Sequence, residues 1–243
     1  MRSFSNTYIF VFSVIMVTIV AVLLSFVSTQ LKPRQEMNIQ IEKKQDVLRS
    51  VGKAEKVAEA SDKNSYIDEE FAKFITESYV VDFNGKTVET DAFEVMLGLN
   101  AEIRKPQEER NYPVFIYADD QGEKKYVVPV RGKGLWGPIW GYIALDSDLN
   151  TIYGAVFDHK GETPGLGAEI NTGWFQEPFT GKTIFNESGE FVSVEVVKGG
   201  ADPSSSHQVD AISGGTITSK ALEEMLLDCL TGYVAHFEEI ATN

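Results

Sequence analysis

Residues 112–130 read YPVFIYADDQGEKKYVVPV and contain two strand-like segments joined by a turn. Aromatic and β-branched residues, which favour strands, are concentrated in 112–118 and 125–130. Between them, 119–122 carries the Asp and Gly residues that turns prefer. The pattern predicts an antiparallel hairpin, and with it a sheet whose strands pair with their neighbours along the chain.

Helical periodicity marks the segments on either side of this hairpin. Apolar residues recur at helical spacing in 68–79 and 91–103 and, most clearly, in 219–239. Further strands are predicted at 139–146 and 152–158, and the segment 191–198 also alternates as a strand does. Helices combined with antiparallel strands predict an α+β domain.

Composition limits what this domain can do. The chain has 243 residues and a formal net charge of −14, so it lacks the basic surface that nucleic-acid binding requires. Its single cysteine, Cys229, excludes an intramolecular disulfide, a Cys-x-x-Cys redox pair, and a cysteine-ligated zinc or iron–sulfur site made by this chain alone. Cys229 lies between apolar neighbours, so we expect a core residue. Any redox chemistry must then be carried by an organic cofactor.

The N-terminal segment 8–27 reads YIFVFSVIMVTIVAVLLSFV and contains no charged residue. A helix of this length spans roughly 30 Å, the thickness of the hydrocarbon core of a bilayer. A cleaved signal peptide is the alternative, but its apolar core is normally shorter and is followed by small residues at a cleavage site, for which 27–29 is a poor match. We expect a retained anchor that spans the membrane once.

Charges around the apolar segment bear on its orientation. Arg2 stands alone before it with the amino terminus, and the basic residues after it are Lys32, Arg34, Lys43 and Lys44. The positive-inside rule, taken alone, therefore places the large domain in the cytoplasm.

Two stretches have the composition of a ligand site. The first, 161–167, reads GETPGLG, and its glycines let the backbone approach a ligand closely. The second, 210–218, reads DAISGGTIT and runs into the last helix, whose N-terminal N–H groups and dipole favour a phosphate. Each also has a plain structural explanation: a simple turn for the first, and a helix capped by Thr218 or Ser219 for the second. The residues alone leave both explanations open.

Taken together, the two stretches resemble the signatures of the FMN-binding domain family. Residues 210–216 are similar to its flavinylation motif, Asp–small–any–Ser/Thr–Gly/Ser–Ala–Thr, in which the last threonine carries FMN. The GETPGLG loop resembles the family's second signature. The segment 132–137, GKGLWG, resembles a third, seen in the C subunit of the Na+-translocating NADH:quinone oxidoreductases. The chain departs from the motif at Gly215, where the family usually has alanine, and the smaller residue loosens the turn.

The resemblance implies a covalent flavoprotein. FMN is expected on Thr216 through a phosphoester bond made by a flavin transferase. Lys198, at the end of the strand just upstream, is a candidate to stabilise a reduced, anionic flavin, and an ordinary surface lysine is the alternative. No catalytic residue and no metal ligand are expected. The residues expected to contact the cofactor are Glu162, Thr163, Pro164, Gly165, Leu166, Gly167, Lys198, Ser213, Gly214, Gly215, Ile217 and Thr218.

The same resemblance implies a one-electron carrier in a Na+-pumping NADH:quinone oxidoreductase complex, without complete activity alone. It places the FMN domain on the extracytoplasmic side of the bacterial inner membrane, which is opposite to the orientation that the flanking basic residues predict. The other subunits of the complex are then its partners, and the membrane span and residues 135–143 are candidate contacts. It divides the chain into an anchor over 1–34, a helical connector region over 35–110 and an FMN-binding domain over 111–243. Two alternatives stay open: the homologous G subunit of a ferredoxin:NAD+ oxidoreductase complex, and a cofactor-free, membrane-tethered scaffold module.

Overall fold

The computed structural model describes residues 5–119 and 121–242 and divides the chain into two compact units, 1–42 and 43–243. Helix α1 (Asn6–Ser50) begins in the first unit and ends in the second. Two residues used in the sequence analysis, Arg2 and Asp120, lie outside the described residues.

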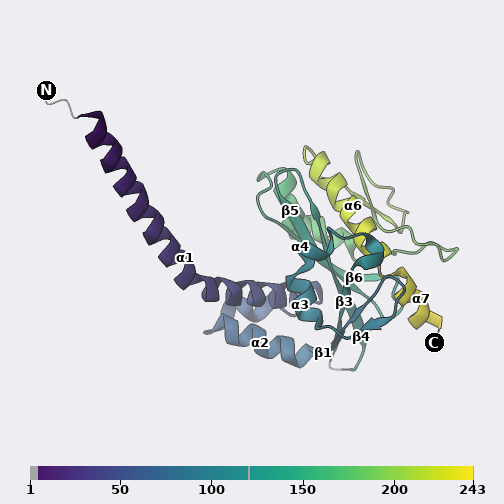
Figure 1. Cartoon of the computed structure of the whole chain (residues 1–243). Helices are drawn as coiled ribbons and strands as arrows, with labels where there is room; N and C mark the ends of the chain where they lie inside the picture. The colour runs from purple at the N-terminus through teal and green to yellow at the C-terminus, as the bar shows by residue number, and fades with distance from the viewer. Residues whose placement is uncertain (1–4, 120, 243) are drawn as a thin grey trace. The chain divides into compact units, whose positions relative to one another are not determined.

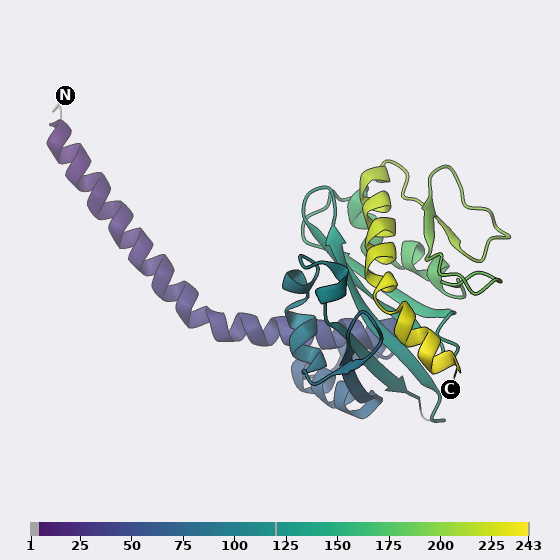
Figure 2. The same cartoon turned by 45° about the vertical axis from the view of Figure 1, so that its right-hand side comes forward.

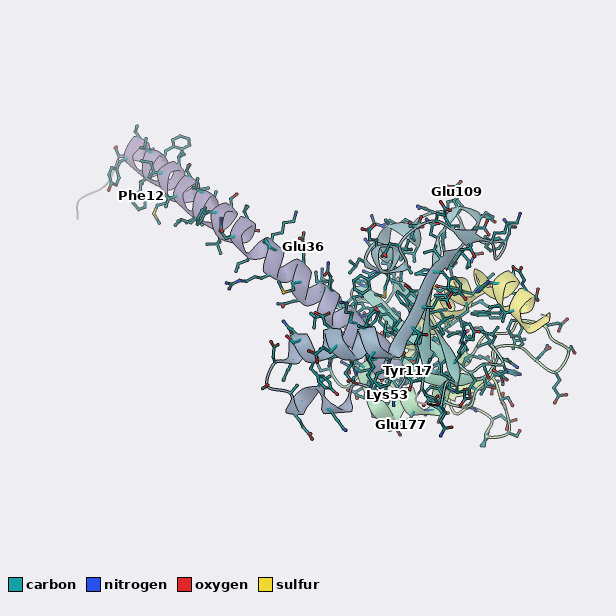
Figure 3. The ribbon with its side chains drawn as sticks, turned by 90° about the horizontal axis from the view of Figure 1, so that it is seen from below. Phe12, Glu36, Lys53, Glu109, Tyr117 and Glu177 are labelled. Atoms are coloured by element: carbon teal, nitrogen blue, oxygen red, sulfur yellow. The ribbon has the colours of Figure 1, made fainter. Side chains whose placement is uncertain are left out.

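The first unit is the helical segment that carries the apolar run. Its large apolar side chains project from the ribbon and are exposed, as Figure 3 shows for Phe12, which is 53% exposed. The Thr18 hydroxyl, within the run, bonds back to the helix itself, since its Oγ1 donates to the Val14 carbonyl at 2.8 Å. By length and composition this helix can cross a membrane, so one apolar N-terminal helix fits a single-pass anchor.

The second unit is built on a six-stranded antiparallel sheet of order β2–β1–β3–β4–β5–β6, in which Figure 1 labels β1, β3, β4, β5 and β6. A separate two-stranded parallel sheet pairs β7 with β8. The strands are β1 (Ile75–Val81), β2 (Thr87–Val88), β3 (Tyr112–Ala118), β4 (Lys124–Lys133), β5 (Pro138–Leu145), β6 (Ile152–His159), β7 (Glu195–Val197) and β8 (Gln208–Asp210).

Helices flank this sheet, so the predicted fold class, an N-terminal apolar helix followed by an α+β domain with an antiparallel sheet, is confirmed. After α1 the α-helices are α2 (Lys63–Phe74), α3 (Ala92–Leu97), α4 (Leu99–Glu102), α5 (Gly173–Gln176), α6 (Thr216–Thr231) and α7 (Val234–Thr242). Short 3-10 helices occupy Glu55–Glu59, Gln107–Glu109, Gly167–Asn171 and Glu177–Phe179.

The two faces of the sheet are covered by different helices, because side chains alternate along each strand. On one face, Val128 of β4 and Ile143 of β5 belong to the same buried core as Leu226 of α6. Figure 2 shows α6 lying across this face. On the other face the end of α1 approaches β6 so closely that a Cβ on Gly154 would lie 2.3 Å from the Ser50 carbonyl oxygen.

Residues 43–110, most of the region expected to be a connector, belong to the same compact unit as the later strands. The helix predicted over 68–79 ends at Phe74, and its last residues form β1, which pairs with β3 through Val80 and Pro113. The sequence ITESYVV of β1 is rich in the β-branched residues that favour strands. This long-range pairing overrides the helical periodicity.

Two other predicted elements also differ from the structure. The helix expected over 219–239 is divided into α6 and α7 at Gly232, where a Cβ would lie 1.9 Å from the Tyr112 ring. The strand expected over 191–198 is formed only by Glu195–Val197. Cys229 is a core residue, as predicted, and burial raises the pKa of its thiol to about 12.

A buried histidine makes the stability of this unit depend on pH. His236 is 7% exposed, and its Nε2 lies 2.8 Å from the hydroxyl of Tyr79. Burial lowers the pKa of His236, so the folded protein favours the neutral imidazole. The unfolded chain binds this proton near its ordinary pKa of about 6.5, so this contribution to stability is present above that pH and is lost as pH falls below it.

We expect the Tm of the unaltered chain to fall more between about pH 7.5 and about pH 5.5 than the Tm of His236→Gln, which cannot titrate there. Thermal unfolding of the detergent-solubilised chain measures both slopes. Tyr79→Phe is the control: it removes the hydroxyl but keeps the imidazole, so it should lower Tm at both pH values and retain the slope. Equal slopes for the unaltered chain and His236→Gln would contradict the prediction.

Candidate functional site

The second of the two glycine-containing stretches ends at the N-terminus of α6. Gly215 is the N-cap residue and Thr216 the first residue of the helix, so the cap expected from Thr218 or Ser219 is not formed. Ser219 instead accepts a hydrogen bond from the Ile212 N–H at 3.0 Å, which fastens the preceding turn to the helix. A helix start without a side-chain cap leaves N–H groups available to a ligand.

Two cavities meet at Thr216. The smaller, of about 260 Å³, lies between the GETPGLG loop and the first turn of α6, and the larger, of about 500 Å³, lies beside β7 and β8. Gly214 and Thr216 line both. The smaller cavity is also lined by Leu135, Glu162, Thr163, Leu166, Gly167, Gly215, Ile217 and Thr218, and the larger by Trp174, Lys198, Gly199, Gly200, Asp210, Ala211, Ile212 and Ser213.

Glycines allow the two loops to touch beside these cavities. Gly214 has φ +78°, and a Cβ there would lie 2.7 Å from Cδ2 of Leu166. At Gly215 a Cβ would lie 2.9 Å from Cγ2 of Ile212 and 3.2 Å from the carbonyl carbon of Leu166. The resembled motif usually has alanine at position 215. In this chain, Gly215 instead allows the two loops to pack closely against each other.

A buried carboxylate connects three segments around the smaller cavity. Glu162 is 4% exposed, and its Oε1 accepts a hydrogen bond from the Trp136 N–H at 2.8 Å. Its Oε2 accepts one from the Thr218 hydroxyl at 2.6 Å. Side chains are excluded at Gly134 and Gly167, where a Cβ would lie 2.6 Å and 2.7 Å from these oxygens. The loop 134–137, the GETPGLG loop and α6 thus converge on one side chain.

Exposed apolar side chains surround Thr216. Ile217, which lines the smaller cavity, is 61% exposed, and Trp174, which lines the larger one, is 55% exposed. Leu135 and Leu166 are also exposed and line the smaller cavity. Apolar walls beside helix N–H groups suit a ligand with a planar aromatic part and an anionic part.

Comparison with known proteins agrees with this geometry. The family model of the FMN-binding domain matches residues 134–231, which include the loop 134–137, the GETPGLG loop and α6. The C subunit of the Na(+)-translocating NADH-quinone reductase of Haemophilus ducreyi is 30% identical over 224 residues, which cover 86% of this chain and 84% of that protein. The chain belongs to the C-subunit family of Na+-translocating NADH-quinone reductases.

Other members of this family support the assignment. The crystal structure of the C subunit from Parabacteroides distasonis matches with a TM-score of 0.72 and 45% identity, covering 85% of this chain and 96% of that one. The Pseudomonas aeruginosa protein is 40% identical over 121 residues, which span 49% of this chain and 46% of that protein. The FMN-binding domain supports FMN as the ligand of the site.

The structure of this family member gathers most of the residues expected to contact the cofactor around the two cavities. Pro164 and Gly165 line neither cavity and form the turn of the loop, where Gly165 has φ +75°. Lys198 is exposed and lines the larger cavity, whereas Glu162 lines the smaller one. His159 accepts a hydrogen bond from the Glu162 N–H through Nδ1 at 3.1 Å, which is a structural contact.

Leu135 and Trp174 line the cavities and are among the apolar or aromatic residues that the sequence-based list of cofactor contacts did not include. Leu135 belongs to the GKGLWG segment, so the motif itself pointed to this loop and only the place of Leu135 in the site was missed. Trp174 stands outside the quoted motifs, and its indole Nε1 donates to Glu169 Oε2 at 3.3 Å. Only the fold brings it to the larger cavity.

Gly167→Ala should damage the site, because its Cβ would lie 2.3 Å from Oγ1 of Thr218 and 2.7 Å from Oε2 of Glu162. Overpacking of this kind costs about 1–3 kcal/mol of unfolding free energy, and the shift of α6 should also lower bound FMN per chain. Chemical unfolding and flavin absorbance measure the two effects. Gly161→Ala is the matched control, because its Cβ would meet no atom within 4 Å. Equal effects of the two substitutions would contradict the packing described.

Proposed function

We propose that this chain is the flavin-carrying electron carrier of a Na+-translocating NADH:quinone reductase, with FMN joined to Thr216 by a phosphoester bond. The observation that carries the proposal is the position of Thr216, which lines both cavities and begins α6. A phosphate on its hydroxyl lies at the positive end of a helix of 16 residues.

Burial and hydrogen bonding favour Thr216 over the neighbouring hydroxyl groups. Thr218 is 2% exposed and its hydroxyl is held by Glu162, and Ser219 is 1% exposed and bonded to the Ile212 N–H. Ser213 is exposed but lines only the larger cavity and precedes the helix. Thr216 is half-buried, which leaves its hydroxyl accessible to a flavin transferase.

Residues around Thr216 have complementary parts in holding the cofactor. The N-terminal N–H groups of α6 hold the phosphate, and Leu135, Leu166 and Ile217 provide apolar surface for the flavin ring. FMN held here would supply one-electron redox chemistry, while the protein sets its position and potential. Glu162, Thr163, Gly167, Gly214 and Gly215 form the remaining wall.

Relatives support the place of this chain in a larger complex. The matched proteins are named as the C subunit of the Na(+)-translocating NADH-quinone reductase, which supports that complex over a ferredoxin:NAD+ oxidoreductase. On this proposal the other subunits supply the remaining redox centres and the Na+ path, and a flavin transferase matures the chain.

We also propose that the FMN domain lies on the extracytoplasmic side of the bacterial inner membrane. A covalent bond is useful there, because FMN that dissociated outside the cytoplasm would be lost. The basic residues that follow the apolar run predict the opposite orientation, and assembly with other membrane subunits overrides so small a charge difference.

The attachment site is tested by the intact mass of the full chain co-expressed with a flavin transferase. We expect an added mass of one FMN minus water, and its complete loss in Thr216→Ala, because Thr216 combines an accessible hydroxyl with a place at the helix start. Ser213→Ala is the matched control, because it removes an exposed neighbouring hydroxyl that lines only the larger cavity, and it should keep the FMN. A colourless unaltered chain in the presence of active transferase would refute the flavin carrier, and FMN retained in Thr216→Ala would refute the site.

Orientation is tested by labelling intact cells with a membrane-impermeant maleimide. Cys229 is 5% exposed and burial raises its thiol pKa, so it should not react, and Ser188→Cys adds a thiol at an exposed position. We expect Ser188→Cys to be labelled fully before permeabilisation. Labelling that appears only after permeabilisation would place the domain in the cytoplasm.

A further inference from the structure

Glu162 is a buried acid in the wall of the site. It is the one carboxylate among the described residues that line the smaller cavity, where it lies with Leu135, Leu166 and Thr216. It is 4% exposed, and none of the salt bridges formed within 5–119 and 121–242 involves it. Charge buried without a cationic partner acts strongly on its surroundings, because water screens it little.

Hydrogen bonds hold this carboxylate in one position. Each oxygen accepts a single bond, Oε1 from the Trp136 N–H at 2.8 Å and Oε2 from the Thr218 hydroxyl at 2.6 Å. The carboxylate occupies space that side chains at positions 134 and 167 would need, because a Cβ at Gly134 or Gly167 would lie 2.6 Å or 2.7 Å from its oxygens. Thr218 lies in the first turn of α6, whose positive end favours a negative charge.

Lys198 was the residue predicted from the sequence to act electrostatically on the flavin, but it does not lie in the same cavity as Glu162. It is exposed, and it lines the larger cavity rather than the smaller one. Solvent screens an exposed charge, so its effect on a flavin in the smaller cavity is weaker than that of buried Glu162.

We propose that Glu162 has two roles in the site. Its hydrogen bonds hold the walls of the smaller cavity in place, and its negative charge lowers the midpoint potential of the bound flavin. The inference rests on the proposed function, since it requires FMN at Thr216. Reduction adds electrons to the flavin, and a fixed negative charge in a poorly screened site opposes that addition. The reduced flavin beside Glu162 is therefore a stronger reductant than it would be beside a neutral side chain at this position.

The test separates the charge of this side chain from its geometry. Glu162→Gln keeps the size and can still accept from the Trp136 N–H and donate to the Thr218 oxygen, but it carries no charge. Glu162→Asp keeps the charge and shortens the reach. Glu169→Gln is the control for loss of a nearby charge. Glu169 accepts from the Gly165 N–H at 3.0 Å and from the Trp174 indole at 3.3 Å, neither of these donors lines the smaller cavity, and Glu169 itself lines neither cavity.

The unaltered chain and the three variants are each co-expressed at full length with the transferase and then solubilised in detergent. The midpoint potential of the flavin is measured by spectroelectrochemical titration. Peptide mass first shows that FMN is on Thr216. We expect a clear rise in midpoint potential for Glu162→Gln and much smaller changes for Glu162→Asp and Glu169→Gln. A purely structural role would instead disturb Glu162→Asp more than Glu162→Gln.

Failure of this inference differs from failure of the proposed function. An unaltered chain without FMN refutes the function. FMN on Thr216 in both proteins, with an unchanged or lower potential in Glu162→Gln, overturns the role of Glu162. If Glu162→Gln does not take up FMN, 13C NMR of the unaltered flavoprotein labelled at glutamate Cδ decides. The Glu162 signal, assigned by its loss in Glu162→Asp, must be that of an ionised carboxylate at neutral pH, and a protonated group overturns the proposal.

Discussion

Packing of α6 across the central strands is the interaction on which the rest of the structure depends. Leu222, Leu226 and Leu230 of α6 are completely buried against the sheet, and burial of each such side chain contributes about 1.5–3 kcal/mol. Gly132 of β4 lets the helix come close, since a Cβ there would lie 2.8 Å from Cβ of Met225. This packing fixes where the N-terminus of α6, and with it Thr216, lies.

Once α6 is in place, the chemistry of the site follows from what reaches its first turn. The loop 134–137 joins β4 to β5, and the loop 161–167 follows β6. Both loops therefore lie at the same edge of the sheet, beside the N-terminal end of α6. Glu162 joins them there through two hydrogen bonds. The result is a half-buried hydroxyl, that of Thr216, on a residue that lines both cavities.

Local patterns predicted the sheet well and the helix boundaries less well. The segment 112–118 is β3 residue for residue, because its apolar and aromatic run is bounded by clear turn residues. The helix over 219–239 was predicted without its break at Gly232. The lack of a side chain there leaves space for the Tyr112 ring, which is more than 100 positions away in the chain, so local periodicity does not contain this contact. Residues 75–81 were predicted mainly as helix, because the pairing that makes them a strand is with β3.

The sequence by itself determined the apolar span, the antiparallel strands of the hairpin and the two glycine-containing stretches, since each depends on residues close together in the chain. It also singled out Thr216 through its motif. Only the tertiary structure decided that Thr218 is buried and bonded to Glu162, that Leu135 and Trp174 line the cavities, and that Lys198 is exposed. These facts depend on which segments the sheet and α6 bring together, and no local pattern encodes a contact between residues 56 positions apart.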